Sequence, residues 1–299
     1  MNIVIEEQGL RDGLQSLAQI IPTATKLEWI ELLCKAGLKR IQVASFVHPD
    51  KVPTMADAES LISQLPTNSN VIFSALVLNE KGLQRAIASG IKHIAISISA
   101  SEVHSIKNTG MTQSDSIVAF RKMVRAAVAA GIKVRGGIQC AFGCRYEGAI
   151  PFSTVRSLID QHLECGITEL ALADSTGMGF PSQIEEYCQY ALSVSDSIPL
   201  SLHLHNTENK GYANLLSAIK SGVRYFDTAF GGLGGCPFIK GATGNIATED
   251  TVHLIHQMGG STGIDMQRVA EVSLMASKFI HEPLPGLVYK LINHSNLKE

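Results

Sequence analysis

Short runs of β-branched and other apolar residues alternate along the chain with longer stretches in which apolar residues recur every three or four positions. Runs of the first kind predict buried strands, and stretches of the second kind predict amphipathic helices. Eight strands are predicted over Ile3–Glu6, Arg40–Val43, Val71–Val77, His93–Ser99, Lys133–Cys140, Glu169–Ala173, Leu200–His205 and Tyr225–Thr228. Helices are predicted between them over Thr25–Ala36, Lys81–Ala88, Ser114–Ala130, Thr154–Cys165, Ser182–Val194 and Tyr212–Ser221.

Several of these helices end at a glycine that directly precedes the next strand. These glycines are Gly37, Gly90, Gly131, Gly166 and Gly222. Each fits the left-handed position that closes a helix, and the repeated helix–glycine–strand order is typical of βα units in a parallel sheet. Eight such units predict an α/β fold, the (β/α)8 TIM barrel, which needs about 250 residues. The remaining length fits extra C-terminal helices near Glu249–Met258 and Asp265–His281.

A doubly wound open sheet is the alternative architecture for the same alternation of elements. It is disfavoured because no glycine-rich dinucleotide-binding motif follows the first strand. The sequence has no linker rich in Pro, Gly or Ser and no low-complexity segment. We therefore expect residues 1–299 to form a single catalytic barrel domain.

Composition and charge exclude several classes of partner. The net charge is −2, and the basic residues are spread along the chain, which argues against nucleic acid as the main partner. No apolar run approaches the roughly 20 residues of a membrane span, and the first residues do not resemble a secretory signal. The six cysteines are sparse, as in reduced cytosolic proteins, so we expect a cytoplasmic protein that does not bind membranes.

Reactive side chains gather where predicted strands end. Asp12 follows the first strand, Asp174 the sixth, and Cys236 the eighth, while His203 and His205 close the seventh. In a TIM barrel the carboxyl ends of all strands meet at one rim, where the active site lies. The sequence therefore predicts that these residues converge.

The His-x-His pair is the most informative of these features. Residues two apart on a strand point to the same face, so His203 and His205 can reach one ion. With a carboxylate from the end of the first strand, the pair predicts a site for a hard or borderline divalent cation. Arg11, which alone would be a surface ion-pair partner of Asp12, then becomes a fixed cation beside the metal. Cys236, which alone would be an ordinary buried thiol, lies in a glycine-rich loop that can close over a substrate.

The chain resembles the 3-hydroxy-3-methylglutaryl-CoA lyase family, within the superfamily of metal-dependent Claisen-type lyases and synthases. The resemblance covers essentially the whole chain. It rests on Arg11-Asp12-Gly13-Leu14-Gln15, Ser45-Phe46-Val47, Arg135-Gly136-Gly137, Tyr146-Glu147-Gly148, Asp174-Ser175-Thr176-Gly177, His203-Leu204-His205-Asn206-Thr207, Gly232-Leu233-Gly234-Gly235-Cys236-Pro237 and Gly244-Asn245-Ile246-Ala247-Thr248-Glu249-Asp250. The cysteine loop and the segment after it are the most specific to the lyases.

The resemblance implies a metal site and a reaction. Asp12, His203 and His205 would hold Mg²⁺ or Mn²⁺, with Asn245 at or beside the ion. The acyl-CoA thioester 3-hydroxy-3-methylglutaryl-CoA, or a close analogue, would be cleaved to acetyl-CoA and acetoacetate. Arg11 would stabilise the enolate, Cys236 would protonate it, and His203 or a metal-linked water is the candidate base.

The resemblance also implies supporting residues. Glu7 and Asp174 would be site carboxylates that orient the metal or the substrate. The residues expected to bind substrate are Arg11, Gln15, Gln42, Thr207 and Gly235.

Two departures from the family pattern bear on substrate recognition. Gln42 stands where the family usually has glutamate, so an acid or base role at that position is lost. Ser16-Leu17-Ala18 replaces the more common Asn-Glu-Lys and removes two charges near the mouth.

Four alternatives therefore stay open. They are a lyase for a related 3-hydroxyacyl-CoA, a condensing synthase, an aldolase for a hydroxy-oxo acid, and a non-catalytic paralogue that binds a CoA ester. The sequence is also compatible with a homo-oligomer, because barrels of this kind often associate.

Overall fold

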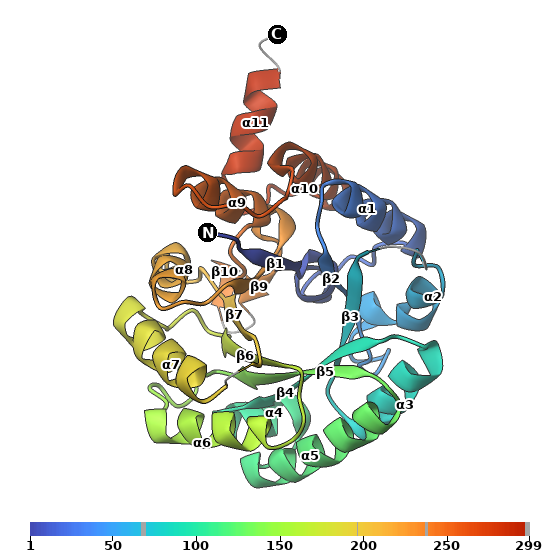
Figure 1. Cartoon of the computed structure of the whole chain (residues 1–299). Coiled ribbons are helices and arrows are strands. Elements are labelled where there is room, and N and C mark those ends of the chain that lie inside the picture. The colour runs from blue at the N-terminus through green and yellow to red at the C-terminus, as the bar shows by residue number, and fades with distance from the viewer. Residues whose placement is uncertain (67–69, 196, 237–238, 297–299) are drawn as a thin grey trace.

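Eight parallel strands close into a barrel in chain order, with the helices around it, in the computed structural model (Figure 1). The strands are β1 (Val4–Glu7), β2 (Arg40–Ser45), β3 (Ile72–Val77), β4 (His93–Ser99), β5 (Lys133–Gln139), β6 (Glu169–Asp174), β7 (Leu200–Leu204) and β8 (Tyr225–Thr228). The ring closes where β1 pairs with β8. The predicted fold and all eight predicted strands are confirmed. The structure describes residues 1–66, 70–195, 197–236 and 239–296, without the side chains of 235–243 and 293–296.

Helices surround the barrel, and most of them cover its outer face (Figure 1). They are α1 (Thr23–Lys35), α2 (Ala58–Ser63), α3 (Glu80–Ser89), α4 (Glu102–Thr109), α5 (Gln113–Ala129), α6 (Phe152–Leu163), α7 (Pro181–Val194), α8 (Gly211–Lys220), α9 (Thr248–Gln257), α10 (Met266–Ile280) and α11 (Val288–Asn296). The predicted C-terminal pair corresponds to α9 and α10. Helix α11, which the sequence did not predict, extends away from the barrel (Figure 1).

The five predicted helix-closing glycines all have positive φ. The values are 95° at Gly37, 77° at Gly90, 73° at Gly131, 82° at Gly166 and 106° at Gly222. The left-handed conformation turns the chain sharply from each helix into the next strand. These turns set the repeating βα geometry that aligns the strands.

The side chains packed between the barrel and the helices are apolar. The interior of the barrel, in contrast, holds buried charged side chains. Trp29 of α1 contacts Phe230 and Phe279 edge to face, which joins α1, the loop after β8 and α10. Inside the barrel, Arg40 and Arg135 pair with buried carboxylates of β1, β6 and β8. Every helix among the described residues is too short or too polar to cross a lipid bilayer.

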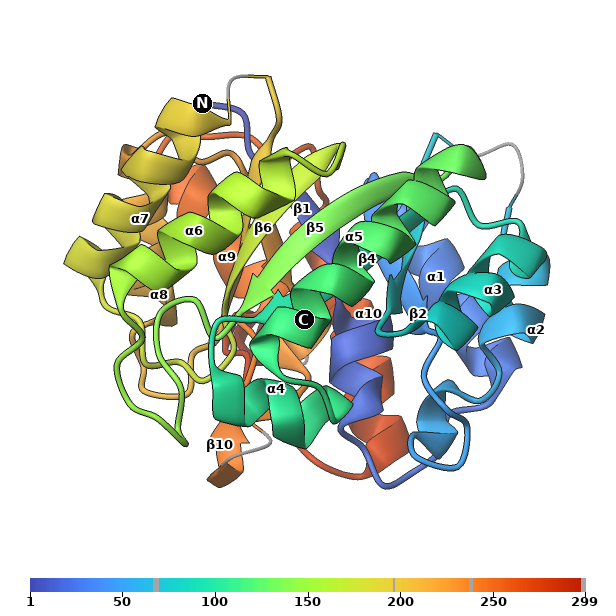
Figure 2. The same cartoon turned by 90° about the horizontal axis from the view of Figure 1, so that it is seen from below.

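The connections that follow the strands lie together at one end of the barrel. Figure 2 shows α4, which follows β4, at the same end as β10 (Ile239–Thr243). β10 pairs antiparallel with β9 (Gly235–Cys236) in a hairpin beyond β8. Three short helical turns complete the chain: η1 (Gly9–Gly13), η2 (Pro53–Met55) and η3 (Phe230–Gly232). This end therefore carries the βα loops in which the sequence predicts the active site.

Candidate active site

A cavity of about 680 Å³ opens at the end of the barrel where the strands finish. Its polar wall includes Arg11, Asp12, Gln42, His203 and His205. Its apolar wall comes partly from Leu76, Ile138 and Leu233, and partly from the α10–α11 connection, residues 281–287. A cavity of this size with a few converging polar groups is typical of a small-molecule site.

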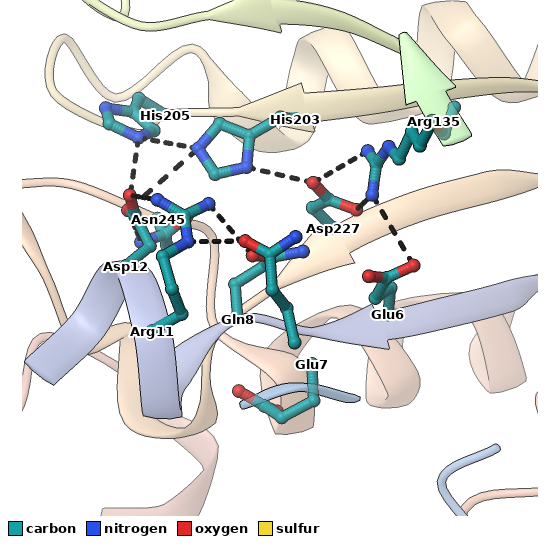
Figure 3. A network of polar contacts seen from close by, with 12 residues as sticks. Glu6, Glu7, Gln8, Arg11, Asp12, Arg135, His203, His205, Asp227 and Asn245 are labelled. Atoms are coloured by element: carbon teal, nitrogen blue, oxygen red, sulfur yellow. Dashed lines mark hydrogen bonds and ion pairs between the residues drawn. The ribbon is translucent and has the colours of Figure 1, made fainter. Parts of the chain in front are cut away.

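Three of the predicted metal ligands meet in this cavity. One ligand atom each from Asp12, His203 and His205 lies within 4.8 Å of the others. The two Nε2 atoms are 3.0 Å apart, and Asp12 Oδ2 is 4.0 Å from that of His203 and 3.9 Å from that of His205. The histidines share a face because they lie two residues apart at the end of β7 (Figure 3). Asp12 is carried on η1, directly after β1.

The charges at this cluster favour an ionised Asp12 beside a neutral His205 imidazole. Burial acts to raise the pKa of Asp12, but Arg11 and both histidines outweigh it, so the pKa is well below its usual range. Burial, together with His203, lowers the pKa of His205 to about 4. Ionised carboxylate and neutral imidazole are the forms that bind metal.

One orphaned polar atom supports the fit of this cluster to a cation. The Asn245 side chain donates from Nδ2 to Asp12 Oδ2 at 2.7 Å and to the Leu233 carbonyl at 3.2 Å. Its Oδ1 is buried and has no hydrogen-bond partner among the described residues. An unpaired amide oxygen next to a carboxylate and two imidazoles suits a divalent ion.

Arg11 is held beside this cluster by three acceptors. Its Nη1 donates to Asp12 Oδ1 at 2.5 Å, its Nε to Gln42 Oε1 at 2.5 Å, and its Nη2 to Gln8 Oε1 at 3.0 Å. Only Asp12 among these acceptors is charged. Gln8, which the sequence did not single out, lies between the end of β1 and the start of η1, so the junction of these two elements positions the arginine.

A second set of site residues that sequence reasoning missed lies beneath His203. Asp227 Oδ2 on β8 is 3.1 Å from His203 Nδ1. Arg135 on β5 donates to both oxygens of Asp227, at 2.9 and 2.8 Å (Figure 3). Asp227 lies inside β8 rather than after it, so the sequence of the loops that follow the strands does not reveal it. Arg135 belongs to one of the family motifs but received no role.

Two predicted site carboxylates lie behind the cavity wall. Glu7 accepts hydrogen bonds from the backbone of Gly9 and Phe230 and from the Thr248 hydroxyl, at 2.7, 2.9 and 2.6 Å. Its carboxylate points away from His203 (Figure 3), and burial raises its pKa to about 7.

Asp174 accepts from the Gly179 backbone at 3.1 Å, and burial raises its pKa to about 6. Neither Glu7 nor Asp174 lines the cavity. Both hold the backbone of loops that frame the site, and a direct role in catalysis stays a prediction.

The predicted substrate-binding residues divide into three groups. Gln15 and Gln42 line the cavity. Thr207 is not among the residues that line the cavity, and its side chain lies close to Gly177. Gly235 and Cys236 form β9, but their side-chain positions lie outside the described part of the structure. The proposed contact of Cys236 with substrate therefore stays a prediction.

The root of the glycine-rich loop is anchored by buried carboxylates and by the C-terminal segment. Glu249 accepts from the Gly231 backbone at 3.0 Å and from the Ser273 hydroxyl at 2.5 Å. Gly286 in turn donates to the Gly231 carbonyl at 2.7 Å. The loop that carries Cys236 thus starts from a fixed point, which α9, α10 and the α10–α11 connection support.

Comparison with known proteins places this site in a family. The family model described as HMGL-like matches residues 2–275. The chain is 37% identical over 298 residues to (R)-citramalyl-CoA lyase of Chloroflexus aurantiacus, covering 96% of this chain and 94% of that protein. It is 35% identical over 284 residues to hydroxymethylglutaryl-CoA lyase YngG of Bacillus subtilis, covering 95% of each.

Solved structures agree with the sequence comparisons. The crystal structure of the Bacillus subtilis HMG-CoA lyase superposes with a TM-score of 0.94 at 34% identity and 98% coverage of both chains. An HMG-CoA lyase from Acinetobacter baumannii in complex with coenzyme A and 3-methylmalate gives 0.92 at 35% identity, covering 96% of this chain and 94% of that one. The resemblance inferred from the sequence motifs is confirmed, and the protein belongs to the HMGL-like family.

Proposed function

We propose that this protein is a divalent-metal-dependent lyase that cleaves a carbon–carbon bond in a 3-hydroxyacyl-CoA. The first substrate to consider is 3-hydroxy-3-methylglutaryl-CoA, which would give acetyl-CoA and acetoacetate. The observation that carries the proposal is the convergence of Asp12, His203 and His205 on one point of the cavity, beside Arg11. The names of the relatives support coenzyme A esters as the substrate class.

Asp12, His203 and His205 would hold Mg²⁺ or Mn²⁺, with the unpaired Asn245 Oδ1 at or beside the ion. A bound divalent ion supplies Lewis-acid polarisation of the substrate's hydroxyl and carboxylate oxygens. A ligand set of one carboxylate and two imidazoles does not decide which divalent ion binds.

The chain's own residues would manage the charge and the protons. The tertiary hydroxyl loses its proton to a base and becomes the ketone as the C2–C3 bond breaks, and His203 can take this proton at Nε2 only when that atom does not hold the ion. The bonding electrons pass to the thioester as an enolate, whose oxygen Arg11 stabilises. Cys236 would give its thiol proton to C2 of the enolate, which completes acetyl-CoA.

A citramalyl-CoA-type substrate is the second candidate. It carries its carboxylate one methylene closer to the hydroxyl carbon, so cleavage would release pyruvate instead of acetoacetate. A relative of 37% identity is named for this activity, and the Acinetobacter structure holds 3-methylmalate beside coenzyme A. Gln42, which replaces the usual glutamate beside Arg11, is the feature of this cavity most able to change how the acyl part is held.

The test is an assay of chelator-stripped protein resupplied with Mg²⁺ or Mn²⁺. It uses the two CoA esters separately and follows acetyl-CoA, acetoacetate and pyruvate. Metal-restored release of acetyl-CoA supports the lyase, and the second product identifies the substrate. Asp12→Asn should abolish metal-restored turnover, and Cys236→Ser should reduce it. Binding of metal and CoA ester without turnover would support a non-catalytic paralogue. Turnover of neither CoA ester, but of other oxo or hydroxy-oxo acids, would support a synthase or an aldolase.

Location and assembly are further proposals. We expect a cytoplasmic protein, which cell fractionation tests. A homo-oligomer is tested by light scattering of the purified protein.

A further inference from the structure

We propose that Asp227 is a positioning residue that fixes the tautomer of His203, and that Arg135 holds Asp227 in place for this purpose. The inference rests on the proposed function, because it assigns the ring nitrogen of His203 that faces the metal site. It concerns two residues of the cavity lining, Arg135 and Asp227, to which the sequence motifs assign no role.

The three side chains form one buried chain of contacts. Arg135 donates from Nη1 to Asp227 Oδ1 at 2.9 Å and from Nη2 to Oδ2 at 2.8 Å. The same Oδ2 lies 3.1 Å from His203 Nδ1. Asp227 is 4% exposed and Arg135 is 9% exposed, so water does not compete strongly for these contacts. Two-point attachment to Arg135 leaves the carboxylate one orientation toward His203.

The charge of Asp227 decides which nitrogen of His203 carries a proton. An ionised carboxylate accepts hydrogen bonds and cannot donate them. Bidentate pairing with the Arg135 guanidinium keeps Asp227 in this form. His203 must therefore donate from Nδ1, and in the neutral ring this leaves the Nε2 lone pair bare. Nε2 is the atom that faces His205 and Asp12, at 3.0 and 4.0 Å.

The two histidines are consequently not equivalent ligands. His205 Nδ1 is buried and has no hydrogen-bond partner among the described residues, so no contact there selects its tautomer. A carboxylate behind a histidine fixes the ring and raises its basicity as a ligand. His203 therefore already has the tautomer that binds an ion before the ion arrives, whereas the tautomer of His205 is not fixed in this way.

Arg135 is itself anchored from the other side. Its Nε lies 3.2 Å from Glu169 Oε1, and its Nη1 lies 3.5 Å from Glu6 Oε2. Both carboxylates also contact Arg40, at 2.6 Å each. The guanidinium therefore has no freedom to swing away from Asp227, and the barrel interior supports the ring that binds metal.

The first test needs no variant other than one for assignment. In metal-free protein labelled with ¹⁵N-histidine, the ring resonances of His203 are identified by their loss in His203→Gln. We expect Nδ1 protonated and Nε2 unprotonated in the neutral ring. An Nε2–H tautomer would overturn the proposal, whether or not the protein proves to be a lyase.

The second test measures Mn²⁺ affinity by the electron paramagnetic resonance of free Mn²⁺. Asp227→Asn should weaken binding about 10- to 100-fold, the usual range for loss of such a partner. Glu169→Gln is the matched control, because it also converts a buried carboxylate on Arg135 to an amide without touching His203. It should stay within about threefold of the wild type. Equal affinities of Asp227→Asn and wild type, or an equal loss in both variants, would overturn the proposal.

The two proposals fail in different ways. Wild-type protein that binds no Mn²⁺ would contradict the metal site of the proposed function, and the tautomer measurement would still decide the role of Asp227. Wild-type protein that binds Mn²⁺ while Asp227→Asn binds it equally well would contradict only the present inference.

Discussion

At the scale of the residue, Arg11 is oriented mainly by neutral hydrogen-bond acceptors, which leave its positive charge in place. Two of its three acceptors, Gln8 and Gln42, are neutral, and the third is Asp12. The amide oxygens orient the guanidinium without neutralising it. Because Asp12 also faces the two histidines, part of the positive charge of Arg11 stays available to a substrate oxyanion.

We predict that Arg11→Lys lowers turnover about 100- to 1000-fold, the effect of removing one oriented donor to an oxyanion. Lysine keeps the charge but cannot reproduce the planar fork that reaches Asp12, Gln8 and Gln42. The measurement is kcat with saturating metal and substrate. Arg85→Lys, which alters a guanidinium paired with Glu59 outside the cavity, should retain wild-type kcat. A fully active Arg11→Lys would remove Arg11 from the mechanism.

Glu249 predicts a pH-dependent stability. Burial raises its pKa to about 7 from an ordinary value of 4.5. The folded state therefore holds the proton more tightly than the unfolded state, and this contribution to stability is complete below about pH 4.5. It is lost as the pH rises through about 7.

Relative to Glu249→Gln, which has no proton to lose, the wild type should lose about 2.5 kcal/mol of unfolding free energy between pH 5 and pH 8. Urea unfolding of both proteins at several pH values measures the difference. Glu31→Gln, which changes an exposed carboxylate paired with Lys35, should show no such trend. A difference that does not vary with pH would contradict the raised pKa.

At the scale of the element, the sequence predicted the barrel well and the short pieces poorly. Strands and long helices follow periodic patterns that burial enforces, and all eight strands were found. The helices α2 and α4 have only 6 and 8 residues, too few for a clear period. Asp12, His203 and His205 were predicted because they end strands. Asp227 was missed because its role comes from contacts with residues on β5 and β7, a relation that no local pattern carries.

Gly231 offers a test of how the loop after β8 joins the C-terminal segment. Its φ is 60°, and a Cβ there would lie 2.2 Å from Leu284 Cδ1. Gly231→Ala should lower the free energy of unfolding by about 2–5 kcal/mol, from backbone strain and from overpacking. Gly90→Ala, at φ 77° with no atom within 4 Å of the added Cβ, should cost only the strain, about 1–2 kcal/mol. Equal losses in urea unfolding would show that Leu284 does not resist the change.

At the scale of the whole molecule, buried charges tie together strands that are far apart in sequence. Arg135 on β5 contacts Glu6 on β1, Glu169 on β6 and Asp227 on β8. Removing one member of such a set leaves the others buried without a partner. The interior of this barrel is therefore specified by charge as well as by apolar packing.

Arg135→Met should lower the free energy of unfolding by about 3–5 kcal/mol, because the carboxylates facing it stay buried. Lys35→Met, which breaks an exposed pair with Glu31, should cost at most about 1 kcal/mol. Chemical unfolding of the two variants beside the wild type measures both values. A loss for Arg135→Met no larger than that for Lys35→Met would mean that the barrel relaxes to rehydrate the acids.

The pairing of β1 with β8 gives the site a place in the order of folding. Asp12 follows the first strand, whereas His203, His205 and Asn245 come from the last third of the chain. Only a segment that runs from Asp12 to Asn245 contains all of these ligands. Contacts between distant parts of a chain form late in folding, because long loops must close first. Metal affinity should therefore emerge when the ring closes. The moment at which a refolding chain takes up Mn²⁺ would mark the completion of the barrel.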